Sequence, residues 1–398
     1  MTDSVIDHPN VTRTASGGDP TPWLARLMRA DGVPSLRREM AGRYPAFTAG
    51  RPAAIAILGA AEEGERLIGL CAGLGIRIAM VLDDNPARQG TRISGIDVQP
   101  SAALAELDHS IPVVVCSHRL LGAVTRLAQL GFDGVPFAAL QVLDPVAFPP
   151  HMFYDGLLED LIENRDHYAR LSDSLADATS RAVLDAVIGF RLTLDARLLE
   201  PVLDEALYAA DCVLPFARDE VYLDGGSYDG DTIRTFIDRV GGSFERVYAF
   251  EPDPDTFRRL VLNFAGEPRV VPIPKGLHRA PGELRFADAG GRASLLTEAG
   301  GIAVPVTSVD TELKGARASY IKMNIEGAEL DALDGACETV RAHAPKLALS
   351  AYHRPSDLWG VAAKVLELRS DYRLYLRQHD GGIIETVLYA IPVRHARS

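Results

Sequence analysis

The feature that most constrains this chain is a regular alternation of short apolar runs with helical patterns, which occurs in two separate blocks. In the first block, from about residue 52, the runs AAIAIL, IRIAMVLDD, VVVC and PFAAL alternate with GERLIGLCAGLG and HRLLGAVTRLAQLG. Strand, helix and strand in that order favour a parallel sheet covered by helices. We therefore predict a small α/β domain over residues 51–148.

The second block begins at EVYLDGG and contains the strand-like runs VYLD, RVYAFE, RVVPI, AVPVTSV, SYIKMN and KLALSAY. Its last two runs, YRLYLR and ETVLYAI, are joined by QHDGGII, whose Asp-Gly-Gly core is a hairpin signal. We predict a parallel sheet closed by an antiparallel hairpin over residues 220–398. Helical periodicity predicts a connector over 149–219 and a helical segment over 23–50, and the polar residues 1–22 are expected to be a disordered leader.

Composition excludes several classes of protein. The net charge of −13 without any Lys/Arg-rich run argues against a nucleic-acid partner. No apolar run approaches the roughly 18 residues that a membrane span requires, and the first residues lack a basic start and an apolar core, so we expect a cytosolic protein. The cysteines have neither CxxC nor Cys/His spacing, so no zinc site or disulfide framework is indicated: Cys71, Cys116, Cys212 and Cys337.

The loop YLDGGSYDGDTIRTF follows the first strand of the second block, where backbone must approach a ligand in a doubly wound fold. Counted from Gly225 it reads GxSxxG rather than the GxGxxG of a dinucleotide site. The surrounding Asp224, Asp229 and Asp231 form a poor cradle for a pyrophosphate. We interpret these carboxylates as suited to a cationic ligand.

An acidic residue also ends the next strand. Glu251 lies 27 positions after Asp224 (251 minus 224), where a carboxylate can accept hydrogen bonds from both hydroxyls of a ribose. An adenosine together with a positive charge indicates S-adenosylmethionine as the cofactor.

Four segments in order, VYLDGGSYDGDTIRTF, RVYAFEPDPDTFRRLVLNF, VPVTSVDTEL and YIKMNIEGAELDALDGA, resemble the FkbM-type methyltransferases that depend on S-adenosylmethionine. The segments LALSAYHRPSDLW and ETVLYAIP resemble the closing part of that family. The resemblance implies a class I methyltransferase fold with a Rossmann-like sheet, and Asn324 stands where many members have aspartate. It implies cofactor contacts at Asp224, Gly225, Gly226, Ser227, Tyr228, Gly230, Thr232, Glu251, Pro252 and Asp253.

The run YIKMNIEG carries a polar row, because Lys322, Asn324 and Glu326 would share one side of an extended strand. In the fold that the resemblance implies, this strand ends beside the transferred methyl group, so the row would face the acceptor. Asn324 cannot act as a base but can orient a hydroxyl. His353, after the next strand, titrates near neutrality and is our first candidate for the general base, followed by Lys322 and Glu326.

Each candidate also has a structural alternative. Glu326 and Glu329 can stabilise the dipole of the helix that they open. Lys322 can pair with a carboxylate, and His353 can hold a backbone carbonyl. A divalent metal held by Asn324, Glu326 and His353 is conceivable, but we assign no metal ligand.

The first α/β block is similar to the Rossmann-like amino-terminal domains of sugar-nucleotide enzymes, with Gly59 and Gly64 in its first turn and Asp83 after its second strand. Glu62 and Glu63 at the helix start oppose a pyrophosphate. We predict a methyltransferase that acts on a hydroxyl of a sugar, a glycan or a secondary metabolite. The alternatives are a nucleotide-sugar or NAD-linked enzyme that works through the first domain, and a non-enzymatic binding or scaffold protein.

Overall fold

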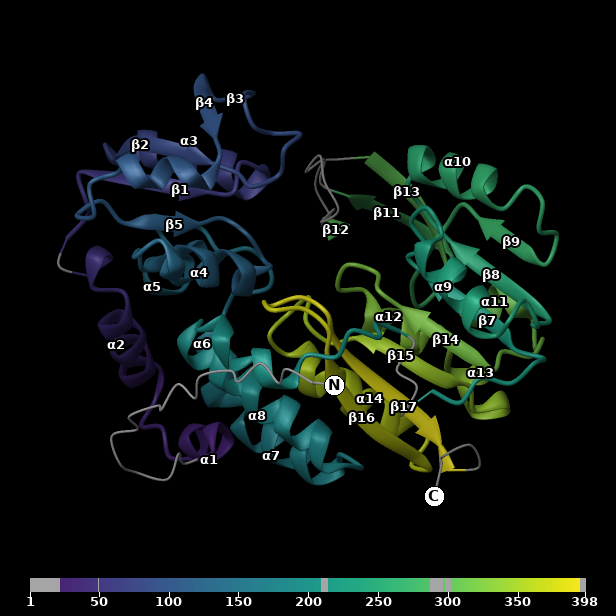
Figure 1. Ribbon diagram of the computed structural model, residues 1–398. Coiled ribbons are helices and arrows are strands. Elements are labelled where there is room, and N and C mark those ends of the chain that lie inside the picture. Colours follow the sequence, from purple (N-terminus) through teal and green to yellow (C-terminus); the bar gives the residue numbers. More distant parts are fainter. Residues whose placement is uncertain (1–21, 49, 209–213, 287–295, 298–301, 394–398) are drawn as a thin grey trace, which may run out of the picture.

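The computed structural model describes residues 22–48, 50–208, 214–286, 296–297 and 302–393. The predicted leader therefore lies outside the described residues, except for its last position. Figure 1 shows a first sheet in purple and blue, a larger sheet in green and yellow, and the teal helices α6, α7 and α8 beside the large sheet. Among the described residues, no helix has both the length and the apolarity needed to cross a bilayer.

The first sheet has the strand order β3-β4-β2-β1-β5-β6, and all of its pairings are parallel except that of β3 with β4. Its parallel part confirms the α/β arrangement expected for this block. The strands are β1 (Ala54–Leu58), β2 (Arg77–Leu82), β3 (Arg92–Ile93), β4 (Ile96–Gln99), β5 (Val113–Val115) and β6 (Gly134–Pro136), and the helices are α3 (Glu62–Leu74), η2 (Ser101–Glu106), α4 (Leu120–Gln129) and α5 (Phe137–Leu143).

The interpretation of PFAAL as a strand-like run was wrong. Strand β6 ends at Pro136, and Phe137 begins helix α5, in which all positions from 137 to 142 are buried. A short apolar run that is buried on every side has no periodicity to separate strand from helix. Here the helix-forming Ala, Leu and Gln residues decide the outcome.

The segment between the two sheets is helical, as predicted. Asp177 caps α8, because its carboxylate accepts a hydrogen bond from the Ser180 amide at 2.7 Å. The Ser180 hydroxyl in turn accepts one from the Leu376 amide at 2.9 Å, which attaches α8 to the large sheet. The helices outside the sheets are α1 (Trp23–Met28), α2 (Val33–Arg43), η1 (Pro45–Phe47), α6 (Leu157–Glu163), α7 (Arg165–Ser174), α8 (Ala178–Thr193), η3 (Ala196–Leu198) and η4 (Glu200–Val202).

The large sheet has the strand order β16-β17-β15-β14-β7-β8-β9. Strand β17 runs opposite to the other strands, which all point in the same direction. This confirms the predicted parallel sheet with an antiparallel hairpin at its carboxyl-terminal end. Its elements are β7 (Val221–Gly225), α9 (Asp231–Arg239), β8 (Arg246–Phe250), α10 (Pro254–Asn263), β9 (Val270–Ile273), α11 (Val309–Leu313), β14 (Tyr320–Met323), α12 (Glu329–Asp334), α13 (Cys337–His343), β15 (Lys346–Ser350), α14 (Asp357–Leu368), β16 (Tyr372–Gln378) and β17 (Thr386–Pro392).

The run AVPVTSV does not join this sheet, so that part of the prediction was wrong. It forms β13 (Ile302–Thr307) of a separate sheet with the order β10-β13-β11-β12. Its alternation correctly indicates a strand, but alternation does not select a partner, and here the partner is the locally adjacent β11. The other strands are β10 (Gly276–Leu277), β11 (Gly282–Phe286) and β12 (Leu296–Thr297).

One apolar core extends from the first sheet through the connector helices to one face of the large sheet. A second cluster covers the other face of the large sheet and contains the stacked rings of Tyr222 and Tyr320, with centroids 4.6 Å apart. Near the carboxyl edge of the large sheet, the Leu121 amide of the first block donates a hydrogen bond to the Gly381 carbonyl at 2.8 Å, and the candidate site lies at this edge.

Candidate active site

The loop after β7 contains two glycines at positions where a side chain would be strained and crowded. Gly226 has a φ of +73°, and a Cβ atom there would lie 2.0 Å from the carbonyl oxygen of Asn324. Gly230 has a φ of +88°, and a Cβ there would lie 2.2 Å from the Phe264 ring. The loop thus packs its backbone directly against the end of β14, as a turn that approaches a ligand requires.

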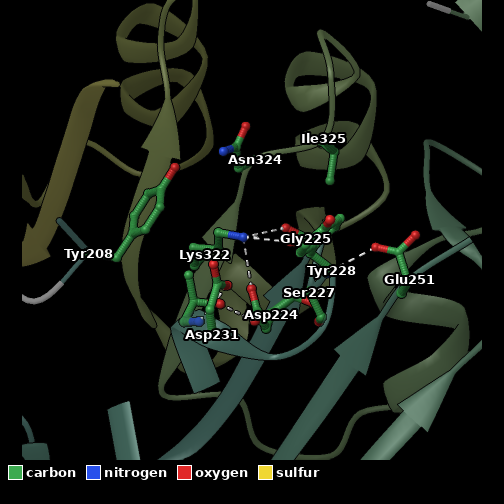
Figure 2. Close-up of polar contacts among 12 residues, drawn as sticks. Tyr208, Asp224, Gly225, Ser227, Tyr228, Asp231, Glu251, Lys322, Asn324 and Ile325 are labelled. Carbon is green, nitrogen blue, oxygen red and sulfur yellow. Dashed lines mark hydrogen bonds and ion pairs between the residues drawn. The ribbon is translucent and has the colours of Figure 1, made fainter. Parts of the chain in front are cut away.

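A buried ion pair supports this loop from below, as Figure 2 shows. The Lys322 ammonium lies 3.0 Å from Asp224 Oδ1 and donates hydrogen bonds to the carbonyls of Gly225 at 3.1 Å and Gly226 at 2.8 Å. Thr232 Oγ1 donates to the other Asp224 oxygen at 2.7 Å. Two of the three N–H groups of the Lys322 ammonium thus bind carbonyls of the loop, while its charge pairs with Asp224. This confirms the structural alternative for Lys322, in which its ammonium pairs with a carboxylate.

The carboxylates around the loop are less available to a cation than the sequence indicated. Asp224 is paired with Lys322, and Asp229 lies 3.1 Å from Arg234. Burial raises the pKa of Asp224, whereas Lys322 lowers it. The sequence analysis used three aspartates to predict a cationic ligand, and two of them, Asp224 and Asp229, are already paired with Lys322 and Arg234. The inference of a nucleoside cofactor therefore depends on the glycine loop and on Glu251.

Glu251 follows β8 and is buried beside the loop. Its Oε2 accepts a hydrogen bond from the Tyr228 amide and its Oε1 one from the Asp253 amide, both at 2.9 Å. Burial raises the pKa of Glu251 to about 7, although these amides and nearby Lys322 lower it. A carboxylate has about four lone-pair positions, so two remain for a ribose.

The other residues predicted to contact the cofactor shape the same loop. The Ser227 hydroxyl is buried and donates to the Asp224 carbonyl at 2.9 Å. Tyr228 has a φ of +50°, and its amide donates to Glu251 Oε2 at 2.9 Å. Asp253 caps α10, with its Oδ1 accepting from the Thr256 amide at 2.7 Å, and Pro252 lies between Glu251 and this cap.

The predicted polar row does not continue beyond the strand. Strand β14 ends at Met323, and Glu326 adopts a left-handed φ of +56°, so the extended alternation stops before Glu326. Asn324 lies at the strand end, where its Oδ1 accepts a hydrogen bond from the Tyr352 hydroxyl at 3.3 Å. Figure 2 shows Asn324 on the far side of Lys322 from the buried Asp224.

His353 is enclosed by carboxylates. Its Nδ1 lies 3.1 Å from Glu329 Oε1 and its Nε2 lies 3.6 Å from Glu326 Oε2. Burial alone lowers the pKa of His353, but Glu329 and Glu326 raise it to about 9. An imidazolium has no lone pair to accept a proton, so this geometry disfavours His353 as the base at neutral pH.

Glu329, His353 and Asp357 place possible ligand atoms within 4.8 Å of one another, and all three residues are buried. The group differs from the set Asn324, Glu326 and His353 considered from sequence. Within this cluster the imidazole Nδ1 lies 3.1 Å from Glu329 Oε1, so Glu329 and His353 form an ion pair.

Two residues that no sequence signal indicated also reach the site. Tyr208, from the connector, has its hydroxyl 3.0 Å from Ser350 Oγ, and its ring centroid lies 5.2 Å from the Lys322 ammonium (Figure 2). Glu385 precedes β17, and its Oε2 lies 3.5 Å from the Tyr208 hydroxyl. Neither residue belongs to a sequence motif. The packing of the connector and of the β16–β17 hairpin brings both side chains to the site.

The corresponding turn in the first sheet is filled by its own side chains. Asp83 Oδ2 accepts a hydrogen bond from the Ala60 amide, and Arg88 donates one to the Ala60 carbonyl, both at 2.8 Å. A Cβ at Gly59 would lie 2.5 Å from the Cys116 carbonyl oxygen, and one at Gly64 would lie 2.0 Å from the Gly59 carbonyl oxygen. These glycines therefore serve close packing between strands and helix, and the geometry favours a scaffold over a nucleotide site.

Comparison with known proteins gives a consistent result. A family model described as the methyltransferase FkbM domain matches residues 224–380. The crystal structure of a methyltransferase FkbM from Methylobacillus flagellatus KT is similar with a TM-score of 0.69 and 25% identity, covering 92% of this chain and 97% of that one. The hexuronic acid methyltransferase AglP of Haloferax volcanii is 34% identical over 97 residues, which are 22% of this chain and 40% of the length of that protein.

Proposed function

Because residues 224–380 match the model of the FkbM methyltransferase domain, we propose that this protein uses S-adenosylmethionine to methylate a hydroxyl of a sugar, a glycan or a secondary metabolite. The observation that carries the cofactor is the pairing of a glycine loop with Glu251. The loop presents backbone at the carboxyl edge of the sheet, and Glu251 is positioned by the amide of Tyr228 from that loop.

The residues present fit this cofactor. Glu251 retains two lone-pair positions for the ribose hydroxyls, and Gly226 leaves no room for a side chain where the loop meets β14. Asp224 Oδ1 is buried without a hydrogen bond among the described residues, although Lys322 pairs with it. When bound, S-adenosylmethionine supplies an electrophilic methyl group on a positively charged sulfur.

The acceptor side favours a hydroxyl. Asn324 and Tyr352 are uncharged, and together they offer an amide and a phenol that can hold an alcohol oxygen. Burial keeps the pKa of Tyr352 well above its ordinary value, so this phenol stays protonated. Similarity to a hexuronic acid methyltransferase adds support for a carbohydrate as acceptor.

Calorimetric titration with S-adenosylhomocysteine tests the cofactor. Wild type should bind one equivalent, and Glu251→Ala should weaken binding roughly 10-fold or more because the ribose loses its acceptor. Asp255→Ala is the matched control, because this carboxylate lies near Glu251 with its side chain 80% exposed. Equal affinity in Glu251→Ala and wild type would remove Glu251 from the site.

Mass spectrometry then tests the acceptor. The enzyme is incubated with S-adenosylmethionine and methyl glycosides of glucose and of glucuronic acid, and products are sought that have gained one methyl group in place of a hydroxyl proton. NADH and UDP-glucose are titrated separately. Binding of either of these without binding of S-adenosylhomocysteine would overturn the proposal and make the first domain the active one.

A further inference from the structure

The hairpin between β16 and β17 brings an acidic residue to the carboxyl edge of the large sheet. Strand β17 pairs antiparallel with β15, with Ser350 opposite Val387, and the Ala351 amide donates to the Thr386 carbonyl at 2.9 Å. Glu385 directly precedes β17, and its Oε2 lies 3.5 Å from the Tyr208 hydroxyl, which in turn lies 3.0 Å from Ser350 Oγ at the end of β15. Glu385 therefore lies on the side of the site that contains Asn324 and not on the side that contains Glu251.

The backbone at Glu385 is in an unusual conformation. Glu385 has a φ of +63°, in the left-handed region that glycine favours. The neighbouring loop shows the same feature, because Glu326 has a φ of +56°. Non-glycine residues in this region are found preferentially at functional sites, where the surrounding structure holds them.

The cations around Glu385 are already engaged by other carboxylates. Arg119 lies 3.2 Å from Asp380, Lys322 lies 3.0 Å from Asp224, and His353 lies 3.1 Å from Glu329. Glu385 itself forms no ion pair within the part of the chain that the structure describes, and Tyr208 is its long hydrogen-bond partner at 3.5 Å.

Among the described residues, the lack of an ion-pair partner distinguishes Glu385 from Glu326, which pairs with His353. Glu326 lies 3.6 Å from His353, and burial raises the pKa of Glu326 although the His353 charge lowers it. For Glu385, burial raises the pKa, and this effect outweighs the lowering by nearby cations. The groups that face Glu385 from its neighbouring elements are Lys322, Arg119, Asp380, His353, Glu326, Tyr352 and Tyr208.

We propose that Glu385 is the general base that accepts the proton of the acceptor hydroxyl, an inference that rests on the proposed methyltransferase function. Tyr352 and Asn324 hold the alcohol oxygen, and its proton moves to a carboxylate oxygen of Glu385. The oxygen forms the new bond to the methyl carbon while the carbon–sulfur bond breaks, and the electron pair of that bond stays on sulfur. The carboxylate becomes a carboxylic acid, and the sulfonium becomes a thioether.

The test compares Glu385→Gln and Glu385→Ala with Asp371→Asn. Asp371 is a matched control, because it lies at the other end of the same hairpin with its side chain 48% exposed. S-adenosylhomocysteine should bind all variants with an affinity within about twofold of wild type. Methyl transfer to the two methyl glycosides should fall roughly 10²- to 10⁴-fold in Glu385→Gln and stay unchanged in Asp371→Asn.

Two further measurements separate a base from a structural residue. Added formate should restore part of the rate in Glu385→Ala, because it can occupy the vacated position and take up the proton. In wild type, the rate should rise with pH as Glu385 loses its proton, and this acidic limb should be absent from Glu385→Gln. Carbon-13 NMR of labelled glutamate carboxyls, assigned by the resonance missing in Glu385→Gln, measures the pKa of Glu385 without any acceptor.

Wild-type turnover in Glu385→Gln, or lack of formate rescue in Glu385→Ala, would overturn the assignment. Loss of S-adenosylhomocysteine binding in Glu385→Gln would show a structural role instead. If wild type binds S-adenosylhomocysteine but methylates neither glycoside, the proposed acceptors are wrong, and the NMR titration decides about Glu385. A carboxyl that titrates at or below its ordinary value of about 4.3 would then refute the proposal, and one that titrates above it would support it.

Discussion

Replacing Lys322 by methionine tests the buried pair on which the glycine loop depends. The side chains of Lys322 and Asp224 are 2% and 0% exposed, and the Lys322 ammonium also holds the carbonyls of Gly225 and Gly226. Methionine has a similar length without the charge. The substitution therefore leaves a buried carboxylate without its cation and two carbonyls without their donor.

The expected loss of stability is large. Removing one partner of a buried pair costs about 3–5 kcal/mol, and an unpaired buried carbonyl adds about 1 kcal/mol. Asp224, whose pKa burial already raises, can take up a proton and so limit the loss. We therefore expect the free energy of unfolding of Lys322→Met to fall by about 3–5 kcal/mol at pH 7.

Urea unfolding measures this difference, and hydrogen–deuterium exchange of peptides from β7 and β14 locates it. Lys275→Met is the control, because Lys275 pairs with Glu312 at 2.7 Å with its side chain 41% exposed, and should cost at most about 1 kcal/mol. Lys322→Met combined with Asp224→Asn should lose less than the sum of the single variants. A loss in Lys322→Met no larger than in Lys275→Met, with unchanged exchange in β7, would refute this account.

Two other substitutions examine the loop and the histidine. Gly226→Ala should reduce affinity for S-adenosylhomocysteine roughly 10-fold or more, because its Cβ would meet the Asn324 carbonyl at 2.0 Å, whereas Gly266→Ala, with no atom within 4 Å, should not. The raised pKa of His353, about 9, stabilises the fold at pH values below its unfolded pKa, and this contribution is lost as pH rises to about 9. The melting temperature should therefore fall between about pH 6.5 and pH 9 in wild type and fall less in Glu329→Gln, and parallel profiles would contradict the ion pair.

Features that depend on neighbouring residues in the chain could be predicted from the sequence. The strands of both parallel sheets, the carboxyl-terminal hairpin and the glycine turn after β7 are encoded by apolar periodicity and by turn residues within a few positions. The place of Glu251 at the end of the next strand follows from the same regularity, since parallel strands end at one edge. PFAAL and AVPVTSV show the limit, because uniform burial hides periodicity and alternation does not select the strand partner.

The roles of the charged side chains were decided by tertiary structure. Lys322 is a support for the loop because Asp224 and two carbonyls surround it, and His353 is a cation because Glu329 and Glu326 flank it. Glu385 reaches the acceptor side only through the pairing of β17 with β15. A pKa depends on burial and on the charges within a few ångströms, and packing brings those charges together from distant parts of the chain. Sequence alone therefore determined most strands and the glycine loop after β7, and packing determined which carboxylates form ion pairs.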